Sequence, residues 1–142
     1  MTAKEFLKQY ERAERLVKQI ETEYAEERER INNIKSALGG DGLPSGNTVS
    51  QPTETAAERL LEKAEKLESA RLEALRVRQI VYSVILSIPD VYGSLLYERY
   101  INLKGWEEVA DVIGYSLSRT FDLHNQSLEI VEHRIESEFC IW

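Results

Sequence analysis

The stretch GWEEVADVIGYSLSRTF, residues 105–121, decides the fold of the second half of the chain. Apolar residues recur in its first part every three or four positions, which is the spacing of one face of an α-helix: Trp106, Val109, Ala110 and Ile113. Gly114 ends this pattern, because glycine readily adopts the positive φ found at helix C-termini. Ser116 or Ser118 can then cap a following helix. The stretch therefore predicts two helices joined by a tight turn.

The same stretch meets the requirements of a helix-turn-helix. Ala110 is small where the two helices must cross closely, and Gly114 occupies the turn. The residues predicted to form the buried spine are Val109, Ile113, Thr120 and Leu123. The residues left facing outward at the start of the second helix, where a recognition helix enters the major groove, are Leu117, Ser118, Arg119, Asp122 and Gln126.

The first 38 residues predict one long helix. Thr2 and Glu5 have the spacing of a capping box, and no helix breaker follows before Gly39. Apolar residues then alternate three and four positions apart, with Glu27 as the one misfit: Phe6, Tyr10, Ala13, Val17, Ile20, Tyr24, Ile31, Ile34 and Leu38. A core-facing amphipathic helix and a coiled coil both bury such a stripe, and its length favours the coiled coil.

A loop and a second long helix are predicted next. The segment GGDGLPSGNTVSQPT, residues 39–53, is too rich in Gly, Pro and small polar residues to bury much surface, so we expect a flexible loop. The second helix is predicted from Thr55 to about Ser87, and its expected apolar face is Leu60, Leu61, Ala64, Leu67, Ala74, Leu75, Val81, Val84 and Ile85. Two such helices predict an antiparallel hairpin, which is thin and therefore expected to form a homo-oligomer.

The expected fold is all-α, with a coiled-coil-like helical hairpin over residues 1–88 and a helix-turn-helix module over residues 89–142. Pro89 suits the first position of a helix, and we expect that helix over roughly residues 90–102. No apolar run approaches the roughly 20 residues that cross a bilayer, so no membrane contact is expected.

The sequence contains no recognisable catalytic motif, so we expect that the protein is not an enzyme. His124 and His133 are nine positions apart, and with Cys140 they form no recognisable zinc spacing. The chain has neither a phosphate-binding GK[ST] loop nor a serine nucleophile elbow. We therefore expect no catalytic residue, metal, cofactor or small-molecule substrate. A single cysteine fits the reducing cytoplasm.

The distribution of charge limits what the predicted DNA reader can do. The net charge of the chain is −7, and residues 89–142 alone carry four Lys/Arg and ten Asp/Glu. Non-specific DNA affinity comes mainly from basic residues that displace counterions from phosphates. DNA is thus expected to bind this module weakly when the protein acts alone.

Residues 87–131, SIPDVYGSLLYERYINLKGWEEVADVIGYSLSRTFDLHNQSLEIV, resemble region four of bacterial sigma factors. With a charged helical hairpin before it, the whole arrangement is similar to small phage proteins of Gram-positive bacteria that are close to the autolysin-regulator (ArpU-type) late transcription regulators. The resemblance implies a phage-encoded DNA-binding transcription regulator of late genes, acting in the cytoplasm of the bacterial host.

Two other functions stay open at this point. The acidic charge of residues 89–142 favours a protein-interaction module that contacts RNA polymerase or another phage protein. Small terminase subunits, which package DNA, also combine a helix-turn-helix with a helical hairpin. They usually place the DNA reader before the hairpin, which is the reverse of the order here.

Overall fold

The computed structural model describes the chain over residues 1–38 and 50–139, and side chains over residues 1–34 and 55–137. Within these ranges the chain forms helices and short turns, and no β-strand occurs among them. The all-α prediction is therefore confirmed. Most of the predicted flexible loop, residues 39–49, lies outside the described residues.

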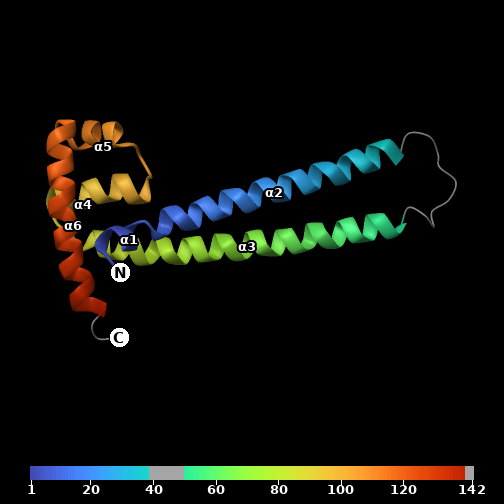
Figure 1. Ribbon diagram of the computed structural model, residues 1–142, viewed down its shortest axis with the longest axis horizontal. Helices are drawn as coiled ribbons and strands as arrows, with labels where there is room; N and C mark the ends of the chain where they lie inside the picture. The colour runs from blue at the N-terminus through green and yellow to red at the C-terminus, as the bar shows by residue number, and fades with distance from the viewer. Residues whose placement is uncertain (39–49, 140–142) are drawn as a thin grey trace. The chain divides into compact units, whose positions relative to one another are not determined.

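The helices follow one another along the chain as shown in Figure 1: α1 (Ala3–Leu7), α2 (Gln9–Leu38), α3 (Ser50–Leu86), α4 (Asp90–Leu96), the π-helix η1 (Tyr97–Ile101), α5 (Trp106–Ile113) and α6 (Leu117–Phe139). Contacts group the chain into two compact units, one made of Met1–Ala13 with Ala74–Trp142 and the other of Glu14–Glu73. The predicted domain boundary between residues 88 and 89 stays a prediction.

The N-terminal helix is capped as predicted but is interrupted. The Thr2 hydroxyl accepts a hydrogen bond from the Glu5 N–H at 3.2 Å, and the Glu5 carboxylate accepts one from the Thr2 N–H at 2.9 Å. The prediction of one unbroken helix is wrong, because a turn at Lys8 separates α1 from α2. The short α1 instead packs against α6, where the Ala3 N–H donates to a Glu132 carboxylate oxygen at 3.1 Å.

The second long helix begins earlier than predicted. Its first residue is Ser50, whereas the predicted start is Thr55. Pro52 therefore lies in the first turn of α3. A missing N–H is tolerated there, because the first N–H groups of a helix have no acceptor within it.

The Glu14–Glu73 unit consists of parts of α2 and α3 that run in opposite directions. Arg71 forms an ion pair with Glu21 at 2.8 Å, and Lys63 pairs with Glu27 at 3.8 Å, so later residues of α3 meet earlier residues of α2. Most apolar residues of the stripe predicted along α2 are buried or half-buried in the structure, and Val17 is fully buried.

The predicted apolar face of α3 is wrong at two leucines. Leu61 and Leu75 are exposed, whereas Leu67, Ala70 and Ala74 are buried. Successive residues of an α-helix are about 100° apart, so Leu75 cannot share the direction of Ala74. The buried residues of α3 are Leu67, Ala70, Ala74, Val77, Val81, Val84 and Ile85.

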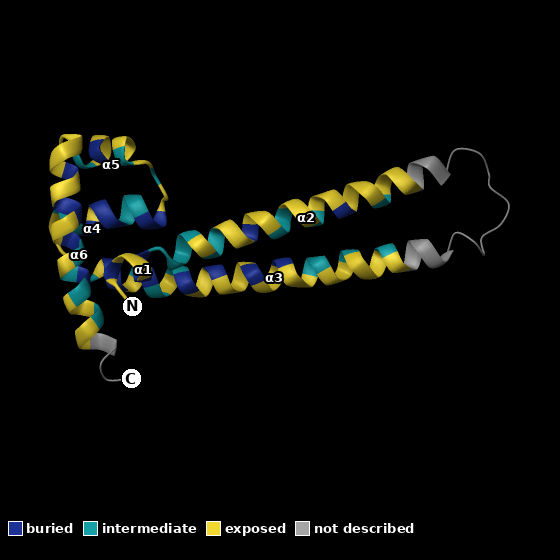
Figure 2. Cartoon of the chain, viewed as in Figure 1, coloured by how far each residue is buried: buried dark blue, intermediate teal, exposed yellow. Residues whose placement is uncertain are grey.

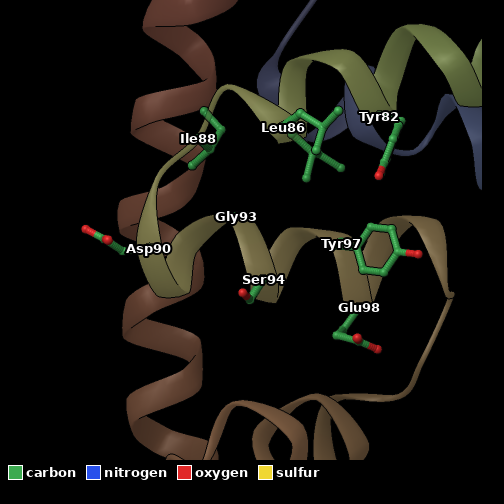
Figure 3. A pocket seen from close by; sticks show the side chains of 9 residues that line it. Tyr82, Leu86, Ile88, Asp90, Gly93, Ser94, Tyr97 and Glu98 are labelled. Carbon is green, nitrogen blue, oxygen red and sulfur yellow. The ribbon is translucent and has the colours of Figure 1, made fainter.

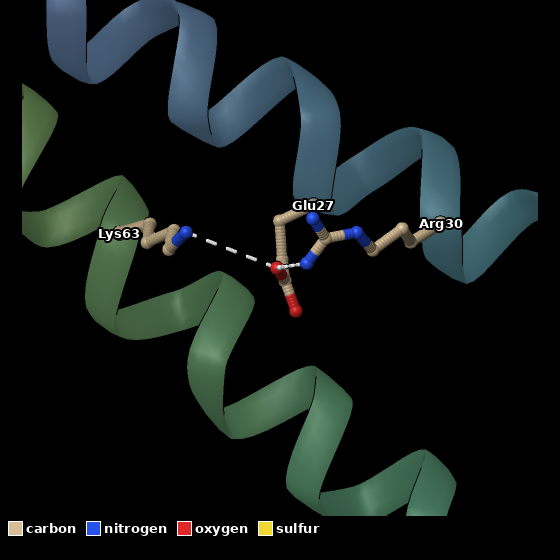
Figure 4. Close-up of polar contacts among 3 residues, drawn as sticks. All are labelled: Glu27, Arg30 and Lys63. Atoms are coloured by element: carbon tan, nitrogen blue, oxygen red, sulfur yellow. Dashed lines mark hydrogen bonds and ion pairs between the residues drawn. The ribbon is translucent and has the colours of Figure 1, made fainter.

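Glu27, the misfit of the predicted heptad pattern, is a buried carboxylate in the Glu14–Glu73 unit (Figure 4). One carboxylate oxygen lies 3.8 Å from the Lys63 Nζ and 3.4 Å from an Arg30 guanidinium nitrogen. Removing a carboxylate from water is costly, and these two cations offset part of that cost.

The other unit has one hydrophobic core, to which α1, α3, α4, η1, α5 and α6 contribute (Figure 2). Its fully buried side chains include Leu7, Val81, Leu95, Leu96, Val109 and Val131. Pro89 precedes α4 as its N-cap rather than taking the first helical position, and Asp90 follows with a φ of 59°. Gly93 of α4 is buried, and a Cβ added there would overlap with the carbonyl oxygen of Ile88.

We predict that Gly93→Ala destabilises the protein, although alanine is ordinarily the better helix former. The added methyl group meets backbone that cannot rotate away, so we expect a loss of about 1–3 kcal/mol in the free energy of unfolding. Urea denaturation followed by circular dichroism measures this. The matched control is Gly105→Ala, where a Cβ meets no atom within 4 Å. Equal losses for the two variants would contradict the close approach.

We predict that Glu27→Leu leaves the free energy of unfolding unchanged or raises it. The substitution removes the cost of burying the carboxylate, and water can solvate the cations left behind, because the Lys63 and Arg30 side chains are 32% and 72% exposed. The control is Glu23→Leu, which adds the same side chain at an exposed position of α2. Thermal melts compare the variants, and a melting temperature clearly lower for Glu27→Leu than for Glu23→Leu would show that the carboxylate is needed.

Candidate nucleic-acid interface

A tight turn joins α5 to α6. Gly114 has φ 78° and ψ 29°, the left-handed conformation that the sequence analysis expected of it. The N–H groups of Gly114 and Tyr115 both donate to the carbonyl oxygen of Ala110, at 2.9 Å and 3.1 Å. These two bonds close the end of α5 and turn the chain toward α6.

The first turn of α6 is held by Ser116. Its hydroxyl oxygen accepts a hydrogen bond from the Arg119 N–H at 3.1 Å, as an N-capping serine does. Its carbonyl oxygen accepts bonds from the N–H and the hydroxyl of Thr120, at 2.9 Å and 2.8 Å. Of the two serines that could cap this helix, Ser116 makes the bond, and Ser118 is exposed.

The inner face of α6 is sharply defined. Thr120, Leu123, Ser127 and Val131 are buried, as is Val109 on α5, and Ile113 is half-buried. The predicted spine of the two helices is thus covered in the structure. This packing fixes which residues of α6 face outward.

All five predicted reading residues are exposed, but they do not form a single row. At about 100° per residue, Ser118 and Asp122 point directly away from the buried Thr120. Arg119 and Gln126 are seven positions apart and share one flank of α6. That flank faces α4, because the Tyr92 hydroxyl donates to the Gln126 side-chain oxygen at 2.8 Å. Leu117 lies on the other flank.

One outward residue is not among those predicted from the sequence. Asn125 is exposed and lies three positions after Asp122 and seven after Ser118, in the most outward row of α6. The helical period set by Thr120 and Leu123 was sufficient to find it. Its amide can both donate to and accept from a base edge.

Aromatic rings pack at the N-terminal part of α6. The Trp106 ring lies edge-on to Phe121, with centroids 5.2 Å apart, and to His124 at 4.6 Å. The Arg99 guanidinium carbon lies 4.5 Å from the Trp106 ring centroid. The Tyr100 hydroxyl and His124 Nε2 form a buried hydrogen bond of 2.6 Å. Burial raises the pKa of Tyr100 to about 12.

The loop before α5 engages two of the four cations of residues 89–142. Lys104 Nζ lies 2.7 Å from the Glu98 carboxylate, and its hydrogen bond lowers the pKa of that carboxyl group. Arg99 donates to the carbonyl oxygen of Lys104 at 2.8 Å. Arg119 is the one cation among residues 115–126. The outward surface of α6 therefore carries little positive charge.

Other kinds of site find no support in the described part of the chain. No group of three His, Cys, Asp or Glu residues there could hold a metal ion. Among its helices, none is long and apolar enough to cross a membrane. No protein-family model, no curated protein and no solved structure matches this chain.

We predict that the free energy of unfolding falls as the pH drops from about 6.5 to about 4, with His124 as one cause. Burial, and then the positive charges of Lys4 and Arg99, lower the pKa of His124 to about 4, against 6.5 for a free imidazole. Between these values the unfolded chain binds a proton that the folded chain excludes. Denaturation measured across this range checks the loss.

The matched variants are His124→Gln and His133→Gln. Glutamine at position 124 can still accept from the Tyr100 hydroxyl and carries no titrating proton, so its pH dependence is expected to be shallower than that of the unchanged protein. His133→Gln makes the same change at an exposed position of α6 and serves as the control. If the free energy of unfolding falls equally with pH in the unchanged protein and in both variants, the prediction is contradicted.

Proposed function

We propose that this protein is a DNA-binding transcription regulator, phage-encoded and acting on late genes, that reads DNA through the outward face of α6. The observation that carries the proposal is the left-handed glycine turn before a helix whose inner face is buried and whose opposite face presents polar side chains. A helix presented in this way suits insertion into the major groove.

The outward side chains suit contact with bases. Arg119 can donate two hydrogen bonds to a guanine, and Asn125 can bond an adenine through both its amide atoms. The Ser118 hydroxyl can form a hydrogen bond with either base. Each good bidentate contact gives about 1–3 kcal/mol of discrimination between bases.

The charge of the surface sets the conditions for binding. With the exposed Asp122 one helical turn after Arg119, the salt-dependent attraction to phosphates is small. A second copy reading a second half-site, or a contact with RNA polymerase, would supply the remaining affinity.

Binding of a protein partner at the turn between α5 and α6 is the second candidate function. Four large apolar side chains around the turn are exposed: Val112, Tyr115, Leu117 and Phe121. Exposed apolar groups next to each other often mark a protein-binding surface, and Asp111 and Asp122 lie beside them in the sequence. RNA polymerase is the partner that the sigma-like resemblance suggests.

We predict that Arg119→Ala weakens DNA binding about 5- to 150-fold, the equivalent of one bidentate contact of about 1–3 kcal/mol. The control is Arg134→Ala, the same change at an exposed position further along α6. Retention of sheared DNA from the source genome, compared at about 50 mM and 200 mM salt, measures the effect. Circular dichroism checks that both variants keep their helix content.

Two results would contradict DNA reading by α6. One is retention of no DNA by the unchanged protein at low salt, and the other is equal retention by Arg119→Ala and the unchanged protein. If purified RNA polymerase is retained instead, and Tyr115→Ser with Val112→Ser abolishes that retention, the second candidate function is supported.

A further inference from the structure

Three cations of the N-terminal segment stand on consecutive helical turns. The Lys8 N–H donates to the carbonyl oxygen of Lys4 at 3.0 Å, and the Arg12 N–H donates to the carbonyl oxygen of Lys8 at 3.1 Å. Residues four positions apart in a helical segment lie one above the other, so the three side chains share one side of the chain. At about 1.5 Å per residue, they extend over about 12 Å. We call Lys4, Lys8 and Arg12 the basic row.

The basic row belongs to the same unit as α6. Residues Met1–Ala13 and Ala74–Trp142 form this unit, in which α1 packs against α6 (Figure 1). Phe6 and Leu7 anchor α1, because both are buried in the core of the unit. The Ala3 N–H, which donates to Glu132, ties the residue just before Lys4 to α6. The fold therefore brings the basic row beside a helix that is distant in the sequence.

The cations of the basic row are available to a ligand. Lys4 and Arg12 are exposed, and Lys8 is half-buried. Among the residues whose side chains the structure describes, none forms an ion pair with any of the three. Residues Met1–Ala13 also contain two carboxylates. That of Glu5 accepts the Thr2 N–H, and Glu11 has a partner of its own.

Helices α1 and α4 border the outward face of α6 on opposite flanks. At about 100° per residue, Gln126 and Glu132 lie on the two sides of that face. Gln126 accepts a hydrogen bond from Tyr92 of α4, and Glu132 accepts one from Ala3 of α1. The basic row therefore accompanies the flank of α6 that α4 does not occupy.

Lys4 lies close to the half of α6 that carries the predicted reading residues. Burial and then the positive charge of Lys4 lower the pKa of His124 to about 4, which requires Lys4 to be near this imidazole. His124 comes two positions after Asp122 and directly before Asn125, and both of these residues face outward. A ligand that covers the outward face at this level can also reach Lys4.

Helix α4 adds no cation to the other flank. Its sequence from Asp90 to Leu96 contains no Lys or Arg. A hollow of about 300 Å³ lies between the end of α3 and the α4–η1 segment (Figure 3). Asp90 and Glu98 are the charged residues among those described as lining it, and both are acidic. Phosphates are repelled from this side of α4.

A helix in the major groove has a DNA backbone on each flank. The groove is about 12 Å wide, and an α-helix with its side chains is about 10–12 Å across, so both strands run close to the helix. Contacts to phosphates fix the position of a protein on the duplex, whereas contacts to bases provide specificity. With α6 in the groove, the strand on the α1 flank would pass the basic row.

We propose that the basic row is a DNA-backbone contact surface, which binds phosphates of one strand while α6 lies in the major groove. This inference rests on the proposed function and adds to it the surface that contacts the backbone. Three cations are few compared with the six to ten phosphate contacts of strongly salt-dependent DNA binding, so the general attraction to DNA stays modest.

The first test is the salt dependence of binding to a fluorescein-labelled DNA duplex of mixed sequence, measured by fluorescence anisotropy with the full chain. Each phosphate contact adds about 0.9 to the slope of log K against the logarithm of salt concentration. Lys4→Ala combined with Lys8→Ala should make this slope less steep by about 1.8. The loss of affinity between about 50 mM and 200 mM salt should then be about tenfold smaller than for the unchanged protein.

The matched control is Lys18→Ala combined with Lys66→Ala. It removes the same charge at exposed positions of the Glu14–Glu73 unit, and we expect it to leave the slope unchanged. Circular dichroism checks that both double variants keep their helix content. Equal slopes for the two double variants would overturn the proposal.

The second test needs no substitution, so a folding defect does not affect it. Lysine amines of the unchanged protein are acetylated with and without the duplex, and peptide mass spectrometry measures the extent at each site. DNA should slow acetylation of Lys4 and Lys8 and leave that of Lys18 as it was. Equal acetylation of Lys4 and Lys8 with and without DNA would overturn the proposal.

The failure of this inference and the failure of the proposed function give different results. If the unchanged protein binds the duplex and the Lys4 and Lys8 substitutions leave the slope as it was, only the basic row is overturned. If the unchanged protein binds no DNA at low salt, both are overturned. If those substitutions reduce the slope but Arg119→Ala binds every sequence as the unchanged protein does, the phosphate contact is supported and reading by α6 is overturned.

Discussion

The burial of one face of α6 is the constraint on which the candidate site depends. Thr120, Leu123, Ser127 and Val131 are covered by a unit to which α1, α4 and α5 all contribute contacts with α6. Each of these residues fixes the rotation of the helix about its own axis. The polar face of α6 is therefore held rigidly outward, and no loop has to position it.

The same unit uses part of its small positive charge for its own architecture. Arg99 covers the Trp106 ring and holds the carbonyl oxygen of Lys104, and Lys104 neutralises Glu98. The π-helix and the loop before α5 are stabilised by these contacts. A module built in this way presents shape and hydrogen-bonding groups more than it presents charge. Under the proposed function, such a surface would discriminate between DNA sequences without a strong general attraction to phosphates.

The parts of the fold that depend on near neighbours in the sequence could be predicted, and those that depend on distant ones could not. Gly114 at the turn and the outward face of α6 follow from residues a few positions apart, and Asn125 could have been found by the same rule. The break at Lys8 and the exposure of Leu75 follow from which helices pack on α1 and α3. The bond that ties Gln126 to α4 joins residues 34 positions apart. The expected function belongs to neither group, because DNA reading depends on a partner that the chain alone does not specify.

The place of α1 has a consequence for how the protein is made. The Ala3 N–H bonds Glu132, 129 positions later in the chain, and Phe6 and Leu7 are buried in the unit that contains α6. On the ribosome, α1 leaves the exit tunnel long before the helices that cover it. It must wait with its apolar side chains uncovered until α6 has been synthesised and has left the tunnel. A chain that stops before α6 would keep this segment open to chaperones and proteases.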